Sequence, residues 1–104
     1  MLENVYYHAI GCGFCIVNNG SKFIEIRMND SSKISVYLAV DVKEQDKYAC
    51  SGAIYWGEGK QIRSEMIHIN KEVSSEREVN ILLDDIRTTV RTITSFINSQ
   101  QELF

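Results

Sequence analysis

The sequence predicts an α+β fold: a mainly antiparallel sheet of about five strands, arranged as hairpins in a meander, with one long C-terminal amphipathic helix packed on one face. Three observations predict this fold. Apolar residues alternate at period two in the first two thirds of the chain, an Asn-Gly step separates two apolar runs, and the last third changes to helical periodicity. Because 44% of the 104 residues are hydrophobic, we expect one core and a single domain over residues 1–104.

The first half of the chain reads as strands joined by turns. Residues 4–10 are expected to form a strand. Residues 14–28 contain two apolar runs around Asn18-Asn19-Gly20-Ser21, and the Asn-Gly step supplies the positive φ angles that a tight hairpin turn needs. Residues 29–32 form a second predicted turn. A half-buried strand follows, because its apolar residues occur at every second position: Ile34, Val36, Leu38, Val40 and Val42.

The segment 43–51 is polar and carries charges of both signs, so it is expected to be a loop. Residues 53–56 and 61–69 then resume a strand-like pattern on either side of Gly57-Glu58-Gly59. This arrangement predicts a second hairpin with a flexible tip.

The C-terminal third is predicted to be one helix. Ser75 and Glu78 have the S-x-x-E spacing of a capping box, and the helix should run to about Gln100. Because a lone amphipathic helix is unstable in water, its apolar stripe should pack on the sheet; a helical dimer seam is the competing arrangement. Asp84, Arg87 and Arg91 lie away from the stripe and predict a solvated helix face. The stripe consists of Val79, Leu82, Leu83, Ile86, Val90, Ile93, Phe96 and Ile97.

Composition limits the possible partners and compartments. The net charge of −3, with no basic run, argues against binding nucleic acid through phosphates. No apolar stretch approaches the roughly 20 residues that cross a bilayer, so we expect no membrane span. The first residues lack the positive charge and apolar run of a secretory signal, and an odd number of cysteines fits a reducing compartment. These features predict a cytoplasmic protein.

Cys12 and Cys15 have the C-x-x-C spacing of zinc and redox sites, and Cys50 with His68 could complete a tetrad of zinc ligands. However, the residues after Cys15 continue as a strand rather than as the helix that activates a redox thiol. Residues three apart in a strand also point to opposite faces unless a glycine bends the chain. We therefore interpret the cysteines as small buried apolar residues, and predict no metal and no cofactor.

Catalytic motifs are lacking in the sequence. His8 and His68 are the side chains expected to titrate near neutral pH, yet each lies in a strand-like context where a hydrogen-bonded structural histidine is the simpler interpretation. No nucleophile elbow, Walker loop or H-E-x-x-H motif is present. The sequence therefore predicts a protein that is not an enzyme.

Exposed aromatic and acidic residues predict a surface for a protein partner. Recognition surfaces combine aromatic anchors with charges that steer encounter and reject wrong partners. The favoured function is a small acidic binding protein, most concretely a bacterial immunity protein that neutralises a toxin such as a nuclease, acting as a monomer. A homodimeric chaperone or phage-type regulator, and a small metal- or thiol-dependent enzyme using Cys12 and Cys15, remain as alternatives. The candidate partner-binding residues are Glu25, Tyr37, Asp41, Glu44, Asp46, Tyr55, Trp56 and Glu58.

Overall fold

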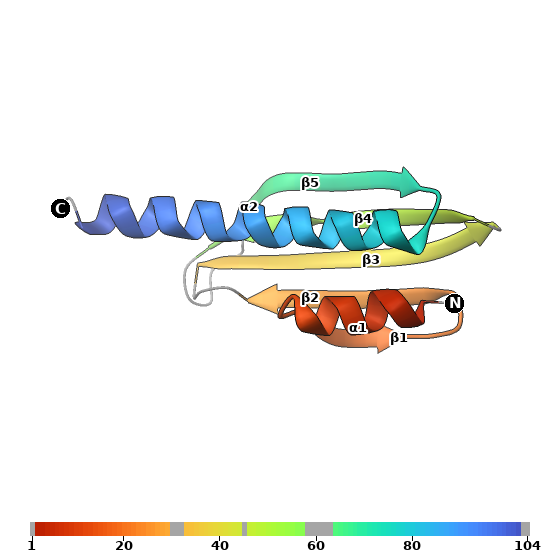
Figure 1. Ribbon diagram of the computed structural model, residues 1–104. Coiled ribbons are helices and arrows are strands. Elements are labelled where there is room, and N and C mark those ends of the chain that lie inside the picture. Colours follow the sequence, from red (N-terminus) through yellow and green to blue (C-terminus); the bar gives the residue numbers. More distant parts are fainter. Residues whose placement is uncertain (1, 30–32, 45, 58–63, 103–104) are drawn as a thin grey trace.

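The predicted α+β architecture is confirmed. The computed structural model describes residues 2–29, 33–44, 46–57 and 64–102, the last three by their backbone. Five strands form one antiparallel meander in the order β1-β2-β3-β4-β5. Both helices lie on one side of this sheet (Figure 1). The elements in chain order are α1 (Glu3–Gly11), β1 (Cys15–Asn19), β2 (Phe23–Asn29), β3 (Ile34–Glu44), β4 (Lys47–Trp56), β5 (Ser64–Val73) and α2 (Glu76–Glu102).

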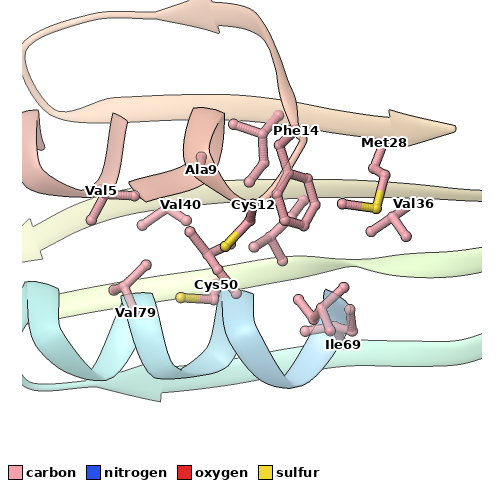
Figure 2. Close-up of a cluster of buried hydrophobic side chains, with 14 of the residues drawn as sticks. Val5, Ala9, Cys12, Phe14, Met28, Val36, Val40, Cys50, Ile69 and Val79 are labelled. Atoms are coloured by element: carbon pink, nitrogen blue, oxygen red, sulfur yellow. The ribbon is translucent and has the colours of Figure 1, made fainter. Parts of the chain in front are cut away.

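The sheet has an inner face, which we define as the side that carries the helices, and an outer face on the opposite side. Cross-strand register places buried apolar residues in rows on the inner face, for example Ile26 beside Leu38 and Val36 beside Ile54. The predicted alternation in β3 is therefore correct. Four residues of the α2 stripe complete the core under the helix: Val79, Leu83, Ile86 and Val90. Figure 2 shows side chains from α1, the sheet and α2 gathered in this core.

The segment 4–10 is a helix, so the predicted strand there is wrong. Leu2, Val5, Ala9 and Cys12 are buried at spacings of three, four and three residues, which is the period of a helix face. The backbone N–H of Gly13 donates to the carbonyl of Ile10, and that of Phe14 donates to the carbonyl of Ala9. With φ of +93° at Gly13, these bonds form the Schellman motif that ends many helices.

The predicted loop at 43–51 is also wrong. Strand β3 continues to Glu44 and β4 begins at Lys47, and these two residues pair with each other; Asp46, just before β4, has φ of +65°. Tyr48 and Cys50 point to the inner face and are buried. Sequence reasoning missed this strand because its inward positions, Tyr48, Cys50 and Gly52, lack the large aliphatic side chains that mark a core strand.

The start of α2 matches the prediction. The Glu78 backbone N–H donates to Oγ of Ser75 at 3.2 Å, and the Glu78 carboxylate accepts from the Ser74 N–H at 2.6 Å. The carboxylate thus reaches one residue further back than in the standard capping box. The helix packs within the chain, as predicted, although Phe96 on its stripe is 64% exposed. Neither helix, within the described ranges, combines the length and apolarity needed to cross a bilayer.

The two predicted hairpins are present, since β1 pairs with β2 and β4 with β5. The tip of the second, from residue 58 to residue 63, lies outside the described residues, as does most of the predicted turn at 29–32. Glu58, one of the candidate partner-binding residues, therefore has no described position.

Candidate functional site

The outer face of the sheet presents four of the eight candidate partner-binding residues: Glu25, Tyr37, Asp41 and Tyr55. Its cross-strand rows are Phe23–Asp41–Ala49–Glu72, Glu25–Ala39–Ser51–Asn70 and Arg27–Tyr37–Ala53–His68. In these three rows, three carboxylates stand against one guanidinium, so the surface is acidic. Small side chains lie beside Tyr37 on β3 and β4, where Ser51 is exposed, Ala39 and Ala49 are half-buried and Ala53 is buried.

Tyr37 is the aromatic group at the middle of this face. Its hydroxyl donates a hydrogen bond to Oε2 of Glu25 at 3.1 Å, across the β2–β3 pair. Partial burial, and then the bond to the Glu25 carboxylate, raise the pKa of Tyr37. The hydroxyl therefore remains a protonated donor at neutral pH, and the bond holds the ring and the carboxylate together as one recognition element.

Glu25 and Tyr55 lie beside Tyr37, but the candidate residues of the outer face do not form one compact patch. Asp41 pairs with Ala49 and Ser35 pairs with Tyr55, so Asp41 and Tyr55 are separated by six residues along the strands. That separation corresponds to about 20 Å at roughly 3.3 Å per residue. Sequence alternation places residues on a face, but the pairing register decides how far apart they lie.

Trp56 belongs to the inner side. It pairs with Ile34, is half-buried against the core cluster, and has the ammonium of Lys33 5.8 Å from its ring centroid. It therefore closes one end of the core rather than extending an aromatic surface. Glu44 and Asp46 lie at the β3–β4 turn, where Glu44 approaches Lys47 at 3.9 Å.

A second cluster of functional groups lies where α1 meets α2. Nε2 of His8 is 2.7 Å from Oδ1 of Asp84, and the Cys12 thiol donates to the same oxygen at 3.3 Å. His8 and Cys12 are one helical turn apart, and Asp84 comes from the first half of α2. The side chains of His8 and Asp84 are 34% and 55% exposed, so this cluster is open to solvent on one side.

The ionisation of the cluster follows from these contacts. The hydrogen bond from His8, followed by that from Cys12, lowers the pKa of Asp84. Burial and the interaction with Asp84 raise the pKa of the Cys12 thiol, while the Arg87 guanidinium acts on that pKa in the opposite direction. At neutral pH the cluster therefore holds a protonated thiol beside a carboxylate. This is the reverse of an activated cysteine nucleophile, whose pKa is depressed.

Each cysteine has a different environment. Cys12 and Cys50 are buried, as the sequence interpretation expected, whereas Cys15 is exposed, contrary to it. Cys15 pairs with Arg27 and so lies on the outer face. Cys50 and His68 lie on opposite faces of the sheet, because their positions in the β4–β5 register differ by an odd number of residues. The tetrad of Cys12, Cys15, Cys50 and His68 is therefore not assembled.

Sequence reasoning missed the cluster of His8, Cys12 and Asp84. It assigned His8 to a strand and Asp84 to a solvated helix face, and it considered Cys12 only together with Cys15. The spacing of Leu2, Val5, Ala9 and Cys12 would have indicated a helix with His8 and Cys12 one turn apart. Nothing local in the sequence connects these two residues to Asp84, which lies 72 positions after Cys12.

Comparison with protein-family models, with curated protein sequences and with solved structures finds no match to this chain.

Proposed function

We propose that this protein binds another protein through the acidic outer face of its sheet. The observation that supports this proposal is the helix-free face on which Glu25, Asp41 and Glu72 surround a centre of small side chains. A sheet face that is not needed for the core can bear such residues without loss of packing. Its charge is complementary to a basic partner surface.

The binding energy and the rate of encounter would come from different groups. Tyr37 supplies apolar area and a hydroxyl that Glu25 orients, so it suits the centre of an interface. The carboxylates around it raise the rate of encounter with a cationic surface and reject an anionic one. This division of work is typical of inhibitors that occupy a partner's surface.

In its most specific form, the proposal is a bacterial immunity protein that acts in the cytoplasm on a toxin domain. Surfaces of nucleases that hold phosphates are basic, so an acidic sheet face is suited to cover one. The protein itself then needs no catalytic group, no nucleic-acid contact and no membrane contact.

The test is affinity capture from the native cell with the full chain as bait, followed by rate measurements on the purified captured protein. We expect wild-type bait to recover a protein with a basic surface at low salt and to lose it at high salt. Asp41→Lys and Glu72→Lys should lower the association rate constant roughly tenfold, because electrostatic steering contributes that order of rate. If the partner is a toxin nuclease, an equimolar amount of this protein should abolish its activity.

Asp85→Lys is the matched control, because Asp85 is an exposed residue of α2 on the other side of the sheet. It makes the same change in net charge without altering the outer face. The proposal fails if wild-type bait retains no specific protein, or if Asp85→Lys slows association as much as Asp41→Lys does.

One observation favours a second candidate, a homodimeric chaperone or phage-type regulator. Phe96 lies on the α2 stripe yet is 64% exposed, and the C-terminal part of α2 extends past the strands (Figure 1). A dimer through this end of the helix would bury the ring. Light scattering at micromolar concentration separates the two candidates: a stable dimer that Phe96→Ser dissociates supports the second candidate, whereas a monomer supports the first.

A further inference from the structure

The cluster of His8, Cys12 and Asp84 offers one nitrogen, one sulfur and one oxygen ligand at a single point. The three ligand atoms all lie within 4.8 Å of one another, and two of the separations are 2.7 and 3.3 Å. Around a tetrahedral zinc ion the same atom types are separated by about 3.3 to 3.6 Å, from metal–ligand bonds of about 2.0 to 2.3 Å. The His8–Asp84 separation thus needs to open by about 0.6 Å and the Cys12–Asp84 separation by about 0.3 Å, which the partly exposed His8 and Asp84 side chains allow.

Two of these ligands, His8 and Cys12, are positioned by α1 in the absence of an ion. His8 and Cys12 are four residues apart, the same spacing by which two ligands on one helix face hold zinc in H-E-x-x-H proteins. The Schellman motif at Gly13 holds the helix end that carries Cys12. Packing of α1 on α2 then brings Asp84 to the pair, so the three ligands come from two elements of the folded core.

The donor set selects the class of ion. A thiolate with an imidazole and a single carboxylate suits zinc and similar borderline-soft divalent ions, whereas magnesium and calcium prefer oxygen ligands throughout. Three protein ligands leave one position of a tetrahedral ion open, which is the pattern of zinc sites that keep a water or an exogenous ligand. The exposed sides of His8 and Asp84 leave that fourth position accessible from solvent.

We propose that His8, Cys12 and Asp84 form a binding site for a single zinc-type divalent cation at the α1–α2 junction. On binding, the Cys12 S–H bond breaks, its proton passes to solvent, and the thiolate bonds to the ion beside the Asp84 carboxylate and Nε2 of His8. The two hydrogen bonds to Asp84 are replaced by bonds to the metal. This site is on the helix side of the sheet and is independent of the proposed function of the outer face.

The positive charge of Arg87 interacts with both Cys12 and Asp84. Its charge disfavours an incoming cation, but it also favours the thiolate that the ion requires. Binding therefore depends on Cys12 giving up its proton, and an ion that binds only to carboxylates should not be retained here. This predicts selectivity for cobalt and zinc over magnesium.

The experiment is a titration of the reduced full-length protein with Co²⁺, followed by competition with Zn²⁺. We expect one equivalent of Co²⁺ to produce a thiolate-to-cobalt charge-transfer absorption together with the visible bands of a tetrahedral ion. One equivalent of Zn²⁺ should remove both, and Mg²⁺ in excess should not. Cys12→Ala should abolish the charge-transfer absorption, and His8→Ala and Asp84→Asn should each lower the Co²⁺ affinity at least about tenfold.

Cys15→Ser and His68→Ala are the matched controls, because they remove the same residue types from the outer face. Both should bind Co²⁺ as the wild-type protein does. The inference is overturned if no stoichiometric charge-transfer absorption appears, or if Cys15→Ser removes it and Cys12→Ala does not. Far-UV circular dichroism of each variant checks that it folds. The conservative Asp84→Asn variant, which keeps the shape of the side chain, tests the site even if Cys12→Ala fails to fold.

Discussion

Gly52→Ala should weaken the fold more than its single added methyl group suggests. Gly52 lies in the middle of β4, between Leu38 of β3 and Ile69 of β5. A Cβ atom there would lie 2.0 Å from the carbonyl oxygen of Tyr37 and 2.9 Å from Cα of Leu38. Because both are backbone atoms, no side-chain rotation can relieve the overlap, and the two central strands must separate by about 1 Å to restore contact distances.

The expected change in the free energy of unfolding is the sum of two opposing effects. Forcing extra volume into a packed core costs about 1 to 3 kcal/mol, and a displaced backbone belongs at the upper end of that range. Alanine also reduces the conformational entropy of the unfolded chain, which stabilises the folded state by about 0.4 to 1 kcal/mol. We therefore expect Gly52→Ala to lower the free energy of unfolding by about 2 to 3 kcal/mol, and to lower Tm by about 10 to 20 °C.

Urea unfolding, followed by circular dichroism and by the fluorescence of Trp56, measures the loss directly as a fall in the midpoint. Ser51→Ala is the control, because Ser51 is the exposed neighbour on the outer face and its replacement should change stability by less than about 0.5 kcal/mol. Equal midpoints for the two variants would refute the close approach of β3 and β4 at Gly52.

Three further predictions concern the core, the helix cap and alkaline pH. Leu83→Ala, at a fully buried position, should cost about 2 to 5 kcal/mol in urea unfolding, whereas Ile81→Ala, at a 50% exposed position, should cost less than about 1 kcal/mol; similar values for both would contradict the packing of α2 on the sheet. Ser75→Ala should cost about 1 kcal/mol through loss of the cap, and Ser75→Asp should restore most of it; helical content and Tm are the measurements, and an unchanged Tm in Ser75→Ala would count against the cap. Burial raises the pKa of Cys50 from its ordinary value of 9.0 to about 11. The folded protein therefore keeps a thiol proton that the unfolded chain loses, so up to about 3 kcal/mol of stability, complete below pH 9, should disappear between pH 9 and pH 11. Urea midpoints across that pH range should fall more steeply for the wild-type protein than for Cys50→Ala, and parallel profiles would show that the thiol is not protected.

The sequence by itself determined those elements whose signal is local. Strand β3 alternates large aliphatic residues at every second position, and Ser75 with Glu78 caps a helix whose apolar stripe spans several turns. In both elements, the apolar residues repeat at the spacing of the strand or helix often enough to identify it. The first helix was missed because its buried face has only four residues, Leu2, Val5, Ala9 and Cys12, and so short a pattern fits a strand as well. Strand β4 was missed because its inward side chains include Cys50 and Gly52.

Only the tertiary structure decided which residues meet. The register of β3 with β4 separates Asp41 from Tyr55 along the outer face, and Trp56, the neighbour of Tyr55, packs against the core, although all three were predicted as candidates for one partner surface. Packing of α1 on α2 brings His8 and Cys12 to Asp84. Distances of this kind depend on strand order and helix packing, which arise from burying the whole apolar surface at once. A local sequence pattern can therefore predict the face of a strand or helix on which a residue lies. Which residues from other elements lie next to it depends on the complete tertiary structure.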